Sequence, residues 1–218
     1  MKENFNIITS TGDNQLCSAL ISPYILRDSA NGPTAVHIAA DALEHGEIWI
    51  PGPINGELAN HFIMELRLAA REKKNLKIFI NSPGGEVDAG LAMLDAVRHY
   101  RYGIDFYCVG LAASMAAVLF AGGRRGHRFI MPHSKVMIHE PLIAGGVGGS
   151  ATSIQRTAES IIETKKTLNS LLAEFTGKAI EEINEKTAYD NFFNAEEAIE
   201  FGLCDAIATG FENEKEDN

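Results

Sequence analysis

The sequence predicts an α/β domain made of βαβ units stacked one after another. Short apolar runs with β-branched and aromatic residues, such as residues 76–80 and 104–109, alternate with stretches whose apolar residues recur at helical spacing, such as residues 87–97. The connections between these segments are short. The 218 residues, 45% of them hydrophobic and 22% charged, suffice for one domain with a sizeable core. Alternation of this kind is typical of a sheet covered by helices.

The elements follow one another regularly from residue 46 onward, because glycine, proline and polar clusters separate them. The β-prone runs predict strands at residues 47–50, 76–80, 104–109, 128–131, 135–138 and 203–207. Apolar spacing predicts helices at residues 58–73, 87–97, 114–121, 154–175, 180–185 and 195–201. The polar residues 81–85 predict a loop, and the glycine-rich residues 145–149 predict a flexible loop or an edge ribbon.

The predicted helix at residues 154–175 is the longest element and ends at Gly177. Its apolar stripe is interrupted at Lys165, whose aliphatic stem can still lie along the apolar face. The stripe is too apolar for a helix that stands alone, so we expect it to pack on the core or to reach another subunit.

The chain is expected to divide into three parts. Residues 1–46 mix polar residues, glycine and proline with short apolar pieces and one short helix near residues 36–43, and we interpret them as an N-terminal extension, either a propeptide or a partner-binding arm. Residues 47–209 form the α/β domain. Residues 210–218 form an acidic, flexible tail.

Composition excludes several function classes. A formal net charge of -10 argues against nucleic acid as the main partner, because phosphate binding needs a basic face. Neither an apolar signal core nor an apolar run long enough to cross a bilayer is visible, so we expect a cytoplasmic protein without a membrane partner. Three widely spaced cysteines predict free thiols, not a disulfide frame or a metal site.

Ser114 is the first candidate for chemistry. It lies among alanines in the motif GLAASMAA, where a β-prone run gives way to a helix. Small neighbours allow close approach to its hydroxyl, and the start of a helix has free backbone N–H groups. The residue is therefore either a nucleophile beside an oxyanion site or a serine that caps the helix.

A serine nucleophile needs a base and an orienting acid. Of seven histidines, His139 differs because it ends an apolar strand and is followed by Glu140 and Pro141. Asp190 is one charge among aromatic residues, where it is expected to be buried. Each residue also has an ordinary structural interpretation: a histidine at a strand end and an aspartate that caps the next helix.

The glycine pair Gly84–Gly85 offers backbone N–H groups at a place where no side chain blocks approach. The acidic Glu86 that follows, and the lack of a Gly-Lys-Ser/Thr sequence after the pair, argue against a phosphate loop. The alternative is an ordinary Pro-Gly-Gly turn.

Taken together, four motifs resemble the family of Clp protease proteolytic subunits (ClpP). They are INSPGG at residues 80–85, GLAASMA at 110–116, MIHEP at 137–141 and YDNF at 189–192. Residues 128–132 and 195–205 also look like this family, so the resemblance covers residues 46–207 in the family's order. Four separated motifs in one order are far more specific than any one of them.

The resemblance implies a crotonase-like α/β fold with a protruding handle helix, and a serine endopeptidase that degrades unfolded proteins. It implies Ser114 as nucleophile, His139 as general base and Asp190 as orienting acid, with the backbone N–H groups of Gly85 and Met115 as oxyanion donors. It also implies heptameric rings stacked in pairs, a Clp-type AAA+ unfoldase as the partner that uses ATP, and no cofactor or metal on this chain.

The chain departs from the family in a few places. Many members carry an acidic residue and an arginine at the positions of Ala188 and Tyr189, and glutamine is usual at Glu140. The alternatives on the same fold are a crotonase-like acyl-CoA enzyme and a viral head-maturation or scaffold protein. An acyl-CoA enzyme would use carboxylates as acid and base, so the paired Ser114 and His139 speak against it.

Overall fold

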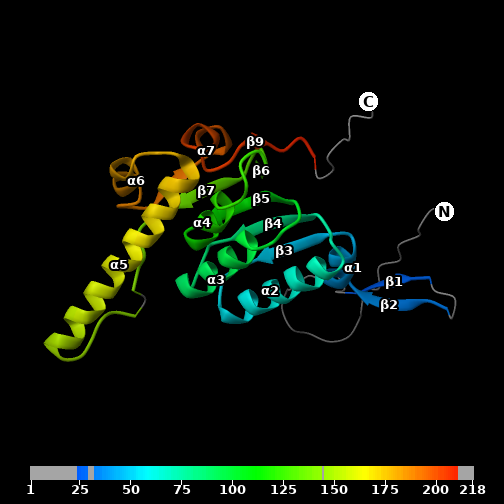
Figure 1. Cartoon of the computed structure of the whole chain (residues 1–218), viewed down its shortest axis with the longest axis horizontal. Coiled ribbons are helices and arrows are strands. Elements are labelled where there is room, and N and C mark those ends of the chain that lie inside the picture. The colour runs from blue at the N-terminus through cyan, green and yellow to red at the C-terminus, as the bar shows by residue number, and fades with distance from the viewer. Residues whose placement is uncertain (1–23, 29–31, 144, 211–218) are drawn as a thin grey trace, which may run out of the picture.

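The computed structural model describes residues 24–28, 32–143 and 145–210, and the predicted α/β class is confirmed. A mostly parallel, seven-stranded sheet has five strands in the order β3-β4-β5-β6-β9; β7 pairs with β5, and β8 pairs with β7. A small antiparallel hairpin, β1–β2, projects from one end of the molecule, and α5 projects from the other (Figure 1). Cys17 and residues 211–218 of the expected tail lie outside the described residues.

The described strands are β1 (Tyr24–Arg27), β2 (Thr34–His37), β3 (Glu47–Pro51), β4 (Leu76–Ser82), β5 (Ile104–Ala113), β6 (Arg128–Ile130), β7 (Lys135–Ile138), β8 (Asn191–Phe193) and β9 (Ala206–Ile207). The described helices are α1 (Ile38–Glu44), α2 (Gly56–Arg71), α3 (Val87–Arg98), α4 (Met115–Ala121), α5 (Ala151–Thr176), α6 (Ile180–Lys186) and α7 (Ala195–Phe201).

Most predicted elements are present, and three differences have clear physical reasons. The predicted strand at 203–207 is reduced to the two residues of β9, because Leu203 and Cys204 are buried just after the left-handed Gly202 and form no ladder. The strand β8 was missed, because three residues are too few to show an alternation. The hairpin β1–β2 was missed because the alternation of its short strands is weak.

Strand β5 changes its partner half-way along its length. Its first half pairs with β6 through residues 106–108, and its second half pairs with β7 through residues 111–113. Gly110 lies between the halves with φ +84°, and its N–H donates to the Ser134 hydroxyl at 2.7 Å. Such a φ is open to glycine and strained for other residues. The bend therefore sends the end of β5 toward β7 instead of along β6.

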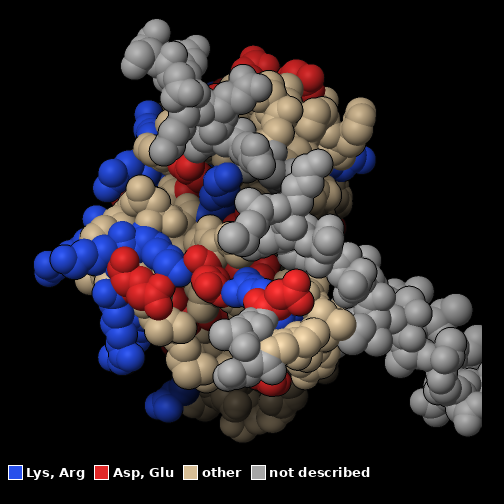
Figure 2. Space-filling view, turned by 90° about the vertical axis from the view of Figure 1, so that its right-hand side faces the viewer, with Lys and Arg blue, Asp and Glu red and all other residues tan. Residues whose placement is uncertain are grey.

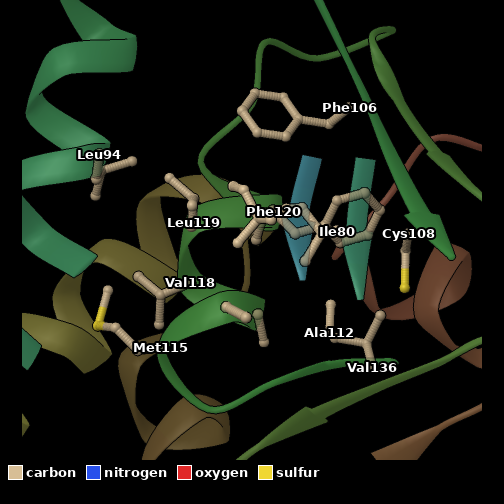
Figure 3. Close-up of a cluster of buried hydrophobic side chains, with 14 of the residues drawn as sticks. Ile80, Leu94, Phe106, Cys108, Ala112, Met115, Val118, Leu119, Phe120 and Val136 are labelled. Atoms are coloured by element: carbon tan, nitrogen blue, oxygen red, sulfur yellow. The ribbon is translucent and has the colours of Figure 1, made fainter. Parts of the chain in front are cut away.

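Helix α4 is the centre of the hydrophobic core, because all seven of its residues are buried. It contacts α3 and α5, and it rests on β5. Leu119 and Phe120 point into the cluster formed with Leu94, Phe106 and Ile80 (Figure 3). A helix that is apolar on all sides belongs inside a domain, so its first residue is held firmly in place.

Helix α5 is packed only at its C-terminal base. Leu168, Leu172 and Phe175 are buried against the core, whereas most residues of the first half, including Ile154 and Ile162, are exposed. The helix ends at Gly177 with φ +77°, as the sequence predicts. The first half of the apolar stripe therefore has no partner among the described residues of this chain.

Both signs of charge lie side by side on the face shown in Figure 2. Among the described residues, no helix is both long and apolar enough to cross a membrane.

A buried ion pair joins β6 to the segment before β9. Arg128 is 3% exposed and donates to both carboxylate oxygens of Asp205, and to the carbonyls of Ala121, Phe175 and Gly202. Burial by itself would raise the pKa of Asp205, but the hydrogen bonds and charge of Arg128, with two backbone N–H donors, outweigh it and hold the pKa below its usual range.

Replacing Asp205 with alanine should lower the free energy of unfolding by about 3 kcal/mol at pH 7, because the Arg128 charge stays buried without its partner. Urea denaturation measures this change. A carboxylate with a lowered pKa stabilises the fold above its ordinary pKa of about 3.9, and this stability is lost as the pH falls through the lower folded value. The wild-type chain should therefore lose more stability than the variant below about pH 4. Equal pH dependence of the two would contradict this role.

Candidate active site

The topology brings Ser114, His139 and Asp190 to one edge of the sheet. Ser114 directly follows β5, and His139 directly follows β7, which runs parallel to the second half of β5. Asp190 directly precedes β8, which is antiparallel to β7 and pairs Asn191 with Ile138. Because β8 runs the other way, its first residue lies at the end where β7 stops. The three residues come together although 76 positions of sequence separate the first from the last.

The three side chains form a continuous hydrogen-bonded series. The Ser114 Oγ lies 2.8 Å from Nε2 of His139, and Nδ1 of the same ring lies 2.9 Å from Oδ1 of Asp190. With the proton on Nδ1, the imidazole donates to the carboxylate, and its free Nε2 accepts from the serine hydroxyl. This is the arrangement in which a hydroxyl can lose its proton to an adjacent base.

Ser114 does not cap the helix that follows it. It stands at the N-cap position of α4, but its side chain makes no capping hydrogen bond. Its backbone adopts φ 54° and ψ −122°, a conformation that non-glycine residues rarely take. Its N–H donates to the carbonyl of Met137 at 2.8 Å. The interpretation as an ordinary capping serine is therefore wrong, and the strained turn points the hydroxyl toward His139.

Asp190 is more exposed than its aromatic neighbours suggest. Its side chain is 62% exposed, whereas the His139 side chain is 14% exposed, so the expectation of a buried aspartate is wrong. The reason is that Tyr189 and Phe192 point outward instead of covering it, at 85% and 53% exposure. The carboxylate keeps its contact with His139 but is accessible to solvent at the same time.

The glycine pair lies directly against the start of α4. A Cβ placed on Gly84 would lie 2.7 Å from Cβ of Ser114 and 2.9 Å from N of Met115. Gly84 has φ +86° and Gly85 has φ +154°. The backbone hydrogen bonds that tie this loop to Ile54 use the carbonyl of Gly84 and the N–H of Glu86, and so leave the N–H of Gly85 unused.

Met115 is the first residue of α4, so its N–H has no carbonyl of its own helix to bond. Its side chain is 2% exposed and lies against Gly90 of α3, where an added Cβ would come within 2.1 Å of the Met115 Cγ. The backbone of Met115 is therefore fixed beside the serine by the packing of its own side chain.

A cavity of about 210 Å³ opens at the serine hydroxyl. Apart from the hydroxyl and the imidazole, its lining is largely apolar and comes from four parts of the chain: Pro83, Gly85, Val87, Met115, Val118, Ile138, Pro141, Leu142, Leu168 and Leu172. A second cavity of about 730 Å³ adjoins it along the first half of α5 and shares Val87, Pro141 and Leu142. The two cavities together offer room for an apolar side chain next to the hydroxyl and for neighbouring residues beyond it.

The two described cysteines take no part in this site. Burial raises the pKa of both Cys108 and Cys204 to about 12, so neither supplies a thiolate near neutral pH. Within residues 24–28, 32–143 and 145–210, no group of three or more His, Cys, Asp or Glu side chains could hold a metal ion.

Sequence reasoning missed the connections between α5 and the histidine. Lys165 Nζ lies 2.5 Å from the Glu140 carboxylate, and Asn169, 1% exposed, bonds to Thr187. The interruption of the apolar stripe at Lys165 was the only sequence signal, and it does not reveal the partner.

Comparison with known proteins identifies the family. The sequence model of the Clp protease family matches residues 30–210. The chain belongs to the Clp protease family. It is 40% identical to the ATP-dependent Clp protease proteolytic subunit 2 of Chlamydia muridarum, over 90% of this chain and 97% of the relative. It is also 40% identical to the ATP-dependent Clp protease proteolytic subunit of Ligilactobacillus salivarius, over 85% of this chain and 94% of the relative.

Membership of the Clp protease family confirms the predicted enzyme class. The chain is a proteolytic subunit of the Clp type and a serine-type peptidase. The crotonase-like fold expected from the resemblance agrees with the mostly parallel sheet and its helices. The peptidase interpretation is thereby favoured over an acyl-CoA enzyme on the same fold.

Proposed function

We propose that Ser114 is the nucleophile of this peptidase, that His139 is its general base and that Asp190 orients the imidazole. The observation that carries the proposal is the 2.8 Å contact between Ser114 Oγ and His139 Nε2. As Oγ attacks the scissile carbonyl carbon, its proton passes to Nε2. Asp190 stabilises the imidazolium through Nδ1–H.

The same imidazole completes the reaction. His139 gives the proton to the leaving amine as the C–N bond breaks, which leaves an acyl group on Ser114. A water molecule then loses a proton to Nε2 and attacks the acyl carbon, and the proton returns to Oγ when the serine leaves. These reaction steps need no cofactor and no metal on this chain.

The backbone N–H groups of Gly85 and Met115 are the proposed donors to the oxyanion that develops in the transition state. Both belong to segments that adjoin Ser114, and neither group is used by the backbone bonds of its own element. Fixed donors beside the reacting atom stabilise the developing charge without reorganisation.

The proposed peptidase domain extends over residues 47–209, with residues 1–46 as an N-terminal extension and residues 210–218 as a tail.

The proposed substrate is an unfolded polypeptide, because a chain must be extended to pass along the two adjoining cavities. We further propose that the subunit works in the cytoplasm as a homo-oligomer of heptameric rings stacked in pairs, fed by a Clp-type AAA+ unfoldase that uses ATP. The exposed apolar residues on the first half of α5 support contact with another subunit. The relatives' names, which include the words ATP-dependent, support an energy-driven partner.

Labelling with a fluorophosphonate probe tests the proposed chemistry. The reagent phosphonylates an activated serine, so we expect a single modification, and peptide mapping should locate it at Ser114. Prior denaturation of the protein should abolish the labelling, because the reactivity of the hydroxyl depends on its contact with His139. Labelling at another residue, or none in the folded protein, would refute the proposal.

A further inference from the structure

Two side chains on one face of helix α5 form hydrogen bonds to the segments that carry His139 and Asp190. Lys165 and Asn169 are four residues apart, so their side chains lie one above the other along the helix. Lys165 reaches the residue after the histidine, and Asn169 reaches the segment that leads to Asp190. The base of the helix is therefore tied to both strands that carry the imidazole and its carboxylate.

The first tie is an ion pair between Lys165 and Glu140, with 2.5 Å between Nζ and Oε2. Glu140 is bonded directly to His139, and Pro141 follows it with a fixed φ. The two charged side chains are 36% and 38% exposed, so solvent screens the pair only in part. The neighbouring pair Lys166–Glu163 differs, since its atoms are 3.9 Å apart and its side chains are over 70% exposed.

The second tie is neutral, and its central residues, Asn169 and Thr187, are buried. Asn169 donates to the hydroxyl of Thr187 at 3.1 Å and to Asn184 at 2.7 Å, and Thr187 is 0% exposed. The carbonyl of Thr187 accepts from the backbone N–H of Glu140 at 2.7 Å. This second tie holds the backbone of Glu140. Among the described residues, the partner of the Glu140 side chain is Lys165.

We propose that the Glu140–Lys165 ion pair positions His139 for the reaction proposed above, and so rests on that function. The histidine is only 14% exposed, and it lies just beyond Ile138–Asn191, the last residue pair that is described between β7 and β8. The ion pair holds the Glu140 side chain against α5 and so limits rotation of the backbone between His139 and Pro141. The imidazole then stays in line with Ser114. Glu140 and Lys165 line neither of the two cavities described above, so we class them as positioning residues.

Single substitutions test the ion pair in the full-length chain. We expect Glu140→Gln and Lys165→Met to lower kcat on a short fluorogenic peptide, and the rate of fluorophosphonate labelling, by about tenfold, since a 1 Å displacement can cost about a hundredfold. KM should stay within about twofold, because the cavities that hold the peptide are unchanged. Lys165→Arg should keep near-normal activity, since it retains the charge.

Two further variants separate positioning from general damage. Lys166→Met removes a neighbouring lysine from the exposed pair on the same helix and should leave kcat and labelling unchanged. The exchange Glu140→Lys with Lys165→Glu should restore most of the activity lost by either single change, because it rebuilds the pair in reverse. Circular dichroism and light scattering should give the same fold and particle size for every variant.

The results distinguish the failure of this inference from the failure of the proposed function. If wild-type Ser114 is not labelled, the proposed chemistry itself fails. If wild-type Ser114 is labelled but Glu140→Gln and Lys165→Met react at the wild-type rate, the positioning role is wrong. A rise in KM with unchanged kcat, or an exchange variant no better than the single ones, would also overturn it.

Discussion

Replacing Ser114 with alanine should lower peptidase activity by about four to six orders of magnitude. The change removes the atom that forms the covalent bond to substrate, whereas the oxyanion donors and the cavity remain. Steady-state hydrolysis of a short fluorogenic peptide measures the loss. Because the hydroxyl makes no capping hydrogen bond, its removal should not loosen α4.

Fold and assembly provide the control for this substitution. Alanine also keeps a side chain in the strained conformation at φ 54°, so the variant should unfold at nearly the wild-type temperature. Light scattering should report the same large oligomer for wild-type and variant, which tests the proposed rings as well. Turnover of the peptide by the alanine variant within a hundredfold of wild-type would exclude Ser114 as the nucleophile.

Replacing Gly84 with alanine should lower kcat/KM by about three orders of magnitude, the upper part of the range for loss of one oxyanion donor. The new Cβ would lie 2.5 Å from the Ala113 carbonyl, 2.7 Å from Cβ of Ser114 and 2.9 Å from N of Met115. The glycine loop must therefore move away from α4, and Gly85 would move with it. The same peptide assay measures this loss.

Gly52 offers a matched control for the effect of φ alone. It has φ +74°, close to the +86° of Gly84, but an added Cβ there meets nothing within 4 Å. Gly52→Ala should cost about 1–2 kcal/mol of stability through its conformation and leave kcat/KM within about twofold. Equal losses of activity in the two variants would show that strain in the fold, and not contact with Ser114, causes the defect.

Much of the fold was predictable from local patterns. The helices α2, α3, α5 and α7 have regular apolar spacing, and α7 also carries a capping box between Asn194 and Glu197. The partner change of β5 was not predictable, because it depends on which strand lies next to it beyond Gly110. The short strand β8 is formed by pairing with β7 and has no pattern of its own.

The identity of the site residues was predictable from the sequence, but their exposure and their contacts with other elements were not. Four motifs selected Ser114, His139, Asp190 and the glycine loop, and the structure brings these residues together. The exposure of Asp190 was not predictable, because it depends on where Tyr189 and Phe192 turn at the start of β8. The contact of Lys165 with Glu140 joins residues 25 positions apart, a distance that no helical or strand period encodes.

The backbone of Ser114 has a consequence for selection on this protein. A non-glycine residue in such a conformation lowers the stability of the fold by about 1–3 kcal/mol, and the buried neighbours in α4 hold it there. Selection for thermal tolerance alone would favour glycine at this position, and only selection for catalysis retains a hydroxyl. Position 114 is thus a point of conflict between stability and activity.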